Sequence, residues 1–178
     1  AAAMTEAGAS VTLISGPVSL DQPQRCQLIS VLCAEEMLNA AASAVKDADI
    51  FISAAAVADY RAADIQNQKI KKKSDKMSLK LVKNPDIVSI LSNDNPGLFV
   101  LGFAAETENV ESHAKDKLVA KKLDAIIAND VSRTDIGFNS DNNEALWIDS
   151  QSCQHLGKKS KTLLARDIVE LIAAKIGN

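Results

Sequence analysis

The lysines of residues 69–83 are the most informative feature of the sequence. Seven of these fifteen residues are lysines, in a chain of 178 residues whose formal net charge is −3. Because two unit charges 4 Å apart interact by roughly 4 kcal/mol at intermediate dielectric, such a run repels itself unless an anion binds nearby. Concentrated positive charge on an acidic protein therefore favours a polyanion at this place, such as a triphosphate or a phosphorylated substrate. A solvated loop is the alternative interpretation.

Small and polar residues on either side of the lysines suggest a ligand site. Ala54–Ala56 place small side chains at the end of a predicted strand, where a ligand can approach the backbone; close packing of a helix is the alternative. Asp59 on the following turn can accept a hydrogen bond from a ribose hydroxyl or an amine, or serve only as a turn residue. Asn84 and Pro85 predict the N-cap and first residue of a helix. The free amides of such a helix start can hold an anion or donate to a base edge.

Three further side chains are candidates for ligand contact. Phe103, one of four phenylalanines, lies in a predicted strand, where it either packs in the core or stacks on a ribose or base. Lys117 and Lys121 share a helical face with Ala114 and Leu118 and should border the buried side of that helix. Their stems either extend past the core to solvent or bring the ammonium groups to a phosphate at the sheet edge.

Several classes of protein are disfavoured by what the sequence lacks. It has no GxSxG, HExxH or P-loop pattern, and His113 and His155 have no companions at metal-ligand spacing, so an activated-nucleophile enzyme has no support. Cys26, Cys33 and Cys153 show no CxxC spacing, which fits a reducing cytoplasm and excludes a zinc knuckle. No apolar run approaches the roughly 20 residues that span a bilayer. An acidic charge balance without aromatics among the lysines disfavours nucleic acid.

Strands alternating with helices predict an α/β fold of the Rossmann-like kind, a three-layer, mostly parallel sheet with helices on both faces and a small β-hairpin extension. We expect one domain over residues 1–178. Strands are predicted at 11–15, 26–31, 50–55, 78–82, 98–104 and 123–128, helices at 34–45, 85–91, 109–122 and 162–176, a turn at 139–143 and a hairpin at 144–148 and 153–156. In such sheets ligands collect at the carboxyl ends of the strands, where residues 54–59, 102–106 and 129–130 fall.

Taken in order, the segments AAAVADY, KIKKK, KNPDIV, GFAAET, ANDV and FNSDNN resemble phosphopantothenate–cysteine ligase, also called phosphopantothenoylcysteine synthetase, in its bacterial CTP-using form. Each segment alone is weak, but the combination is specific and covers nearly the whole chain. The resemblance implies a ligase of coenzyme A biosynthesis. The carboxylate of 4′-phosphopantothenate attacks the α-phosphate of CTP, giving an acyl-cytidylate and pyrophosphate, and the amine of L-cysteine then displaces CMP. Mg²⁺ accompanies the triphosphate.

The resemblance also implies residue roles. Lys69 would be the catalytic lysine of a mobile flap at residues 64–80, where positioned positive charge stabilises phosphoryl oxygens without a protein nucleophile. The residues implied for the CTP site are Ser53, Ala54, Ala55, Asp59, Lys69, Pro85, Asp86, Ile87, Val88, Phe103, Lys117 and Lys121. Those implied for the other substrate are Ala55, Ala56, Lys71 and Lys72. No metal ligand from the protein is expected.

Family members begin with a strand and a Gly-rich turn that carry a substrate-binding Asn and Arg, and this sequence starts beyond that segment. We therefore expect weak nucleotide binding and poor activity from the chain as given. The resemblance further implies a homodimer and a fused or associated phosphopantothenoylcysteine decarboxylase domain. Two alternatives remain. The first is an NAD(P)-dependent Rossmann-type oxidoreductase, which would need a GxGxxG turn that the seven glycines do not form. The second is a nucleotide-binding or dimerisation fragment without activity of its own. The preference for CTP over ATP rests on the resemblance alone.

Overall fold

A computed structural model describes residues 1–66, 68–71, 75–132 and 142–177. Lys72 and the part of the predicted turn at 139–141 lie outside these residues. The main sheet has five strands in the order β10-β9-β7-β6-β3. Their bounds are Cys153–His155, Leu146–Asp149, Ala125–Asp130, Phe99–Glu106 and Ile50–Ser53. Strands β3, β6 and β7 run parallel, whereas β9 and β10 form the predicted antiparallel hairpin.

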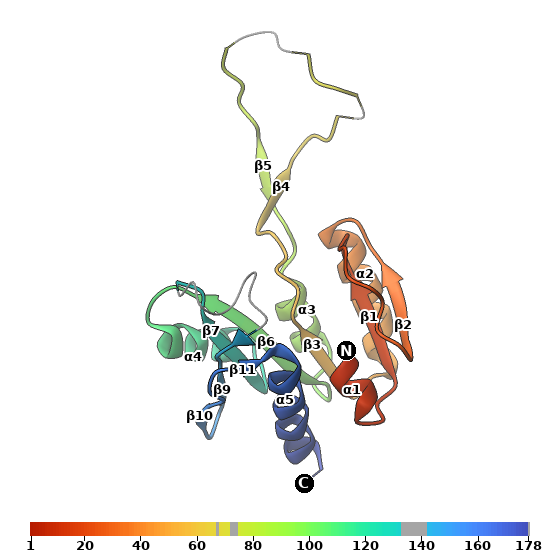
Figure 1. The fold of residues 1–178 in the computed structure, drawn as a ribbon. Helices are drawn as coiled ribbons and strands as arrows, with labels where there is room; N and C mark the ends of the chain where they lie inside the picture. Colours follow the sequence, from red (N-terminus) through yellow and green to blue (C-terminus); the bar gives the residue numbers. More distant parts are fainter. Residues whose placement is uncertain (67, 72–74, 133–141, 178) are drawn as a thin grey trace.

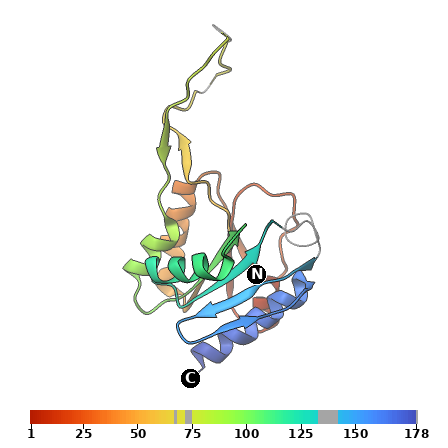
Figure 2. The ribbon, with the colours of Figure 1, turned by 90° about the vertical axis from the view of Figure 1, so that its left-hand side faces the viewer.

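Helices cover both faces of this sheet, which confirms the predicted three-layer α/β fold (Figures 1 and 2). One core cluster joins the sheet to α2 (Ala34–Ala44), α3 (Ile87–Asp94) and α4 (Val110–Ala120). A second joins the opposite face to α5 (Lys161–Ile176), with Met4 of α1 (Ala2–Glu6) packed against it. Strands buried on both faces need near-continuous apolar runs, which is why the segments around β3, β6 and β7 are recognisable in the sequence.

A separate pair of parallel strands lies beside the main sheet. It consists of β1 (Val11–Ser15) and β2 (Cys26–Ser30), with Val11 opposite Cys26, and α2 packs on β1. Among the described residues, β1 pairs with β2 alone and β3 pairs with β6 alone. A short antiparallel pair, β8 (Asn142–Asn143) and β11 (Lys159–Ser160), leads into α5.

A long arm projects from the body of the protein (Figure 1). At its root, β4 (Tyr60–Ala62) pairs with β5 (Leu81–Lys83) in antiparallel fashion, with Arg61 opposite Val82. We call residues 60–83 the arm; they include the predicted flap at 64–80. The sequence placed the second strand at 78–82, three residues too early, and missed β4, because neither strand has the buried face that produces a clear apolar pattern.

Helix α3 does not begin where the sequence predicts. Its N-cap is Asp86, whose side chain accepts a hydrogen bond from the Ser89 amide at 3.1 Å, and the helix starts at Ile87. The prediction of Asn84 as N-cap and Pro85 as first helical residue is therefore wrong. The physical reason is competition, because the Asn84 Oδ1 that would act as the cap accepts from Arg61 Nη1 at 3.2 Å, while the Asn84 side-chain amide donates to the Ala58 carbonyl at 2.8 Å.

Two sequence-based expectations, on the cysteines and on membrane spans, can be compared with the structure. Cys26, Cys33 and Cys153 are free thiols. In the part of the chain that the structure describes, no helix has the length and apolarity to cross a membrane. The predicted helix at 162–176 corresponds to α5, which buries Leu164, Ile168 and Ile172, while Leu163 is half exposed.

Candidate functional site

The carboxyl end of β3 lies beside the middle of β6. Ser53, the last residue of β3, is paired with Gly102 of β6, and Ala54–Ala56 follow as an exposed segment. A Cβ atom on Gly102 would lie 2.7 Å from Leu123 Cδ1, so the glycine makes room for the packing of Leu123. The small residues that are free for a ligand to approach are therefore the three alanines.

A carboxylate at the end of β6 organises two basic side chains. Glu106 is only 13% exposed, and its Oε1 accepts from Lys117 Nζ at 2.5 Å. His113 Nδ1 lies 3.5 Å from the other carboxylate oxygen, so this histidine faces the strand end and is not a plain surface residue. Sequence reasoning missed Glu106, although an acidic residue that ends a buried strand at the ligand edge was a usable signal.

A second carboxylate and lysine meet at the start of α3. Lys121 Nζ lies 2.9 Å from Asp86 Oδ2, and Ser92 Oγ donates to the Lys121 carbonyl at 2.6 Å. Burial raises the pKa of Asp86, but hydrogen bonds from Lys121 and Ser89 outweigh it and hold the pKa below its usual value. Ile87 is buried in the core and Val88 packs against it. This segment can therefore offer a ligand its backbone and the Asp86 carboxylate, but not those two side chains.

The other predicted residues are spread over the surface. Phe103 pairs with Ile127, which belongs to the core cluster on the α5 face, so Phe103 points to the face opposite Glu106. It is 41% exposed. Asp59 is exposed at the root of the arm, and its carbonyl accepts from the Asn84 amide at 2.8 Å.

The lysines of the arm do not meet the lysines of the body. Lys69 and Lys71 are exposed and form no ion pair with the described residues. The arm carries them away from the sheet (Figure 1). The structure thus places Ser53 beside Gly102 of β6 and joins Asp86 to Lys121, but it does not bring Lys69 to either group.

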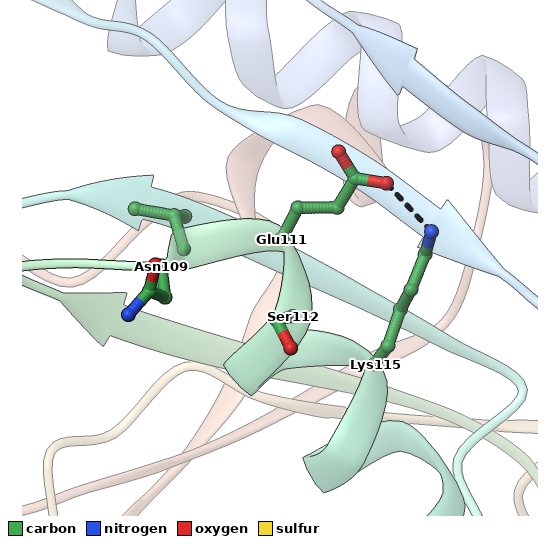
Figure 3. A pocket seen from close by; sticks show the side chains of 5 residues that line it. Asn109, Glu111, Ser112 and Lys115 are labelled. Carbon is green, nitrogen blue, oxygen red and sulfur yellow. Dashed lines mark hydrogen bonds and ion pairs between the residues drawn. The ribbon is translucent and has the colours of Figure 1, made fainter.

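A hollow of about 460 Å³ lies at the first turn of α4 and contains none of the predicted residues. Figure 3 shows its lining, in which the Glu111 and Lys115 side chains point toward one another and form an ion pair at 2.6 Å. Both side chains are about half exposed, and an exposed ion pair on one helical turn is only weakly stabilising. The lining residues are Asn109, Val110, Glu111, Ser112 and Lys115. We therefore place the candidate site at the ends of β3 and β6.

The carboxylates of the described residues do not form a metal site. No group of three or more His, Cys, Asp or Glu side chains among them is arranged to hold a metal ion. Glu106 and Asp86 are each engaged by a lysine. A metal ion that approached either of these two carboxylates would therefore compete with a lysine.

Comparison with known proteins assigns nearly the whole chain to one family. The family model described as DNA/pantothenate metabolism flavoprotein C-terminal domain matches residues 1–176. Proteins named Coenzyme A biosynthesis bifunctional protein CoaBC are similar to this chain. That of Haemophilus influenzae is 47% identical over 97% of this chain and 43% of its own length. That of Bacillus subtilis is 39% identical over 98% of this chain and 43% of its own length. The chain thus spans less than half the length of these relatives.

Solved structures agree in fold. The crystal structure of the C-terminal domain of CoaBC superposes with a TM-score of 0.83 and 29% identity, covering 99% of this chain and 79% of that one. The DNA/pantothenate metabolism flavoprotein from Streptococcus pneumoniae has a TM-score of 0.79 at 22% identity, over 97% of this chain and 84% of its own, and supports the fold alone. The chain belongs to the DNA/pantothenate metabolism flavoprotein C-terminal domain family.

Proposed function

We propose that the chain is the ligase domain that joins 4′-phosphopantothenate to L-cysteine in coenzyme A biosynthesis. The observation that carries the proposal is the match of residues 1–176 to one family whose relatives bear the name Coenzyme A biosynthesis bifunctional protein. The arrangement at this edge of the sheet is compatible with it, because exposed small residues follow β3 and Glu106 holds Lys117 at the end of β6, where an α/β sheet receives ligands.

In the proposed first step, a carboxylate oxygen of 4′-phosphopantothenate attacks the α-phosphate of CTP, and the bond to the β-phosphate breaks to release pyrophosphate. In the second, the amine of L-cysteine attacks the acyl carbon, the bond to the cytidylate oxygen breaks and CMP leaves. Neither step needs a nucleophile from the protein. What the protein must supply is orientation and positive charge against the phosphoryl oxygens.

The lysines are the residues that supply this charge in the proposal. Lys117 and Lys121 would release Glu106 and Asp86, or share them, when phosphate oxygens arrive, since a charge-assisted bond to phosphate can replace one to a carboxylate. Lys69 would act as the catalytic lysine and Lys71 and Lys72 as substrate contacts, after the outer part of the arm bends toward the strand ends while its root keeps its direction. Mg²⁺ would enter with the triphosphate as its counter-ion, and no step is assigned to it.

We assign the remaining predicted residues to contacts with the two substrates. Ala54 and Ala55 would allow the nucleotide to approach the backbone beside Ser53, and Ala55 and Ala56, which are exposed, would also contact the second substrate. The Asp59 carboxylate would accept from a ribose hydroxyl. Pro85–Val88 would meet the cytosine end through backbone groups, and the exposed face of Phe103 would lie against the nucleotide.

We further propose that the chain forms a homodimer through the arm and works beside a decarboxylase domain. Apolar side chains of the arm are 53–80% exposed, namely Tyr60, Ile65, Ile70, Met77, Leu79 and Leu81, and a second copy is the partner that would cover them. Sedimentation equilibrium tests the dimer, and Leu79→Lys should shift the chain to monomer. The bifunctional relatives, of which this chain spans about 43%, motivate the decarboxylase partner.

The test of the ligase activity is pyrophosphate release that requires CTP, 4′-phosphopantothenate and L-cysteine together. We would measure it in the chain as given and in a version preceded by the strand and Gly-rich turn of family members. Lys69→Gln should abolish turnover without changing the melting temperature, while Lys80→Gln, another arm lysine, should retain it. Normal rates in Lys69→Gln would contradict the role of Lys69. Hydride transfer from NADPH without pyrophosphate release would instead favour an oxidoreductase.

Nucleotide class is tested by thermal stabilisation with CTP, ATP, GTP and UTP in the presence of Mg²⁺. A ligand that binds only the folded protein at 100 times its Kd stabilises by about 2.7 kcal/mol, which is readily measured. A shift with CTP alone supports the proposal. Binding of CTP without turnover in either version would indicate a nucleotide-binding domain without activity of its own.

A further inference from the structure

The root of the arm carries a cluster of polar contacts that the proposed reaction does not use. Arg61 of β4 donates from Nη1 to the Lys83 carbonyl at 2.9 Å and to Asn84 Oδ1 at 3.2 Å. From Nη2 it donates to Glu35 Oε1, in the first turn of α2, at 2.6 Å. The Arg61 guanidinium thus connects both strands at the root of the arm with helix α2 of the body.

Asn84 forms hydrogen bonds that join the two segments at the root of the arm. Its backbone amide donates to the Asp59 carbonyl at 2.8 Å, and its side-chain amide donates to the Ala58 carbonyl at 2.8 Å. Farther out, the Ala63 amide donates to the Lys80 carbonyl at 2.9 Å. These hydrogen bonds fix the two strands of the arm to each other. They do not define the direction of the arm relative to the body of the protein. The bond from Arg61 to Glu35 supplies that reference.

Direction at the root matters because the arm is a lever. Lys69 lies eight residues beyond Arg61, so an extended chain can carry it up to about 26 Å from the root. A rotation of roughly 10° at the root would then move Lys69 by about 4 Å, more than the length of a hydrogen bond. The projecting shape of the arm is visible in Figure 1.

The guanidinium suits this task for geometric reasons. Arg61 and Glu35 are 38% and 58% exposed at the side chain, so the ion pair adds little to global stability. A planar fork that donates to three oxygens in different directions does, however, define an orientation, which the single ammonium of a lysine cannot do.

We propose that Arg61 is a positioning residue that orients the arm, and with it Lys69, through its bonds to Glu35, Asn84 and the Lys83 carbonyl. Its consequence for catalysis rests on the proposed ligase function, whereas its effect on the direction of the arm does not. Arg61 acts on the reaction only through the place of Lys69.

Pulsed electron–electron double resonance tests the direction of the arm and does not require the protein to be enzymatically active. Spin labels at Ser43→Cys on α2 and Ser78→Cys on the arm, in the chain with its three native cysteines changed to serine, report the distance between arm and body. Arg61→Gln should at least double the width of the distance distribution, and Arg61→Lys should give an intermediate width. The matched control is Arg166→Gln, which breaks an exposed Arg–Glu pair of similar length between α5 and α1. An unchanged distribution in Arg61→Gln overturns the proposal.

Steady-state kinetics then test the catalytic consequence. Arg61→Gln should lower kcat at least tenfold with less than a twofold change in the KM for CTP, because the strand ends are untouched, and Arg166→Gln should change neither. A broadened distance distribution with normal kcat overturns the role of Arg61 in catalysis. If no version of the protein releases pyrophosphate from CTP and Arg61→Gln still broadens the distribution, the ligase function fails while the orienting role of Arg61 stands.

Discussion

Asp86 and Lys121 are 35 residues apart in the sequence and form one ion pair, with Lys121 Nζ 2.9 Å from Asp86 Oδ2. Asp86 also caps α3 by accepting from the Ser89 amide. The same carboxylate therefore begins a helix and holds the end of α4. In the proposed site, a phosphate that binds Lys121 would meet a lysine that is already aimed by Asp86.

Two substitutions separate these roles of Asp86. Asp86→Ala removes the cap and the ion pair, and we expect the free energy of unfolding to fall by about 1–2 kcal/mol. Asp86→Asn keeps a good cap and loses only the exposed ion pair, so it should cost less than about 1 kcal/mol. Urea denaturation of both variants checks the difference. Equal losses would mean that the cap contributes nothing.

Asp149 should make the stability of the fold depend on acid pH. Its side chain is 2% exposed, and Lys175 Nζ lies 2.9 Å from Oδ2, which also accepts from Trp147 Nε1 at 2.8 Å. Burial raises the pKa of Asp149, but the bonds from Lys175, Trp147, Gln151 and Ser152 outweigh it and hold the pKa well below its usual range. Because the folded pKa is depressed, the stabilisation is present above the unfolded pKa of about 3.9 and is lost as pH falls through the folded pKa.

The measurement is the melting temperature of wild type and Asp149→Asn between pH 2 and pH 7. The variant should lose about 1–3 kcal/mol near neutral pH, because a charged acceptor is replaced by a neutral one in a buried network. Its stability should also fall less steeply below pH 4. Asp116→Asn, an exposed aspartate, is the control. A parallel pH profile in Asp149→Asn would contradict the assignment.

Gly102 is predicted to be intolerant of a methyl group. An added Cβ would lie 2.7 Å from Leu123 Cδ1, and Leu123 is buried, so its side chain has little room to move. Gly102→Ala should lower the free energy of unfolding by about 1–3 kcal/mol through overpacking. Gly97→Ala is the matched control, since nothing lies within 4 Å of its Cβ position. Chemical denaturation checks both, and equal stability of the two variants would refute the argument.

The sequence predicted the layers of the fold well and the ion pairs of the candidate site poorly. Runs such as 50–53 and 99–106 are apolar because both faces of the sheet are covered, and that pattern is local. The bond between Lys117 and Glu106 depends on where a helix packs relative to a strand end, which no local pattern encodes. The sequence likewise left Asn84 free to cap α3, because Arg61, which donates to its side-chain oxygen, lies 23 residues away. Of the two arm strands, β4 showed no recognisable pattern, and β5 was predicted only in part, at 78–82.

Lys117 should be the lysine of the α4 helix that matters for the nucleotide. It faces the strand end through Glu106, whereas Lys115, on the same helix, is held by Glu111 in the hollow at the first turn of α4. Lys117→Met should weaken CTP binding by about tenfold or more, since a hydrogen bond to a charged group contributes roughly 1.5–3 kcal/mol.

The matched variant, Lys115→Met, removes the same charge from the same helix and should leave CTP binding within about twofold, because long-range charge effects are screened at physiological salt. Isothermal titration at 0.15 M salt, with circular dichroism to confirm that both variants fold, measures the contrast. Equal weakening by the two substitutions would mean that the helix contributes only diffuse charge, and a stronger effect of Lys115→Met would move the nucleotide to the hollow at the first turn of α4.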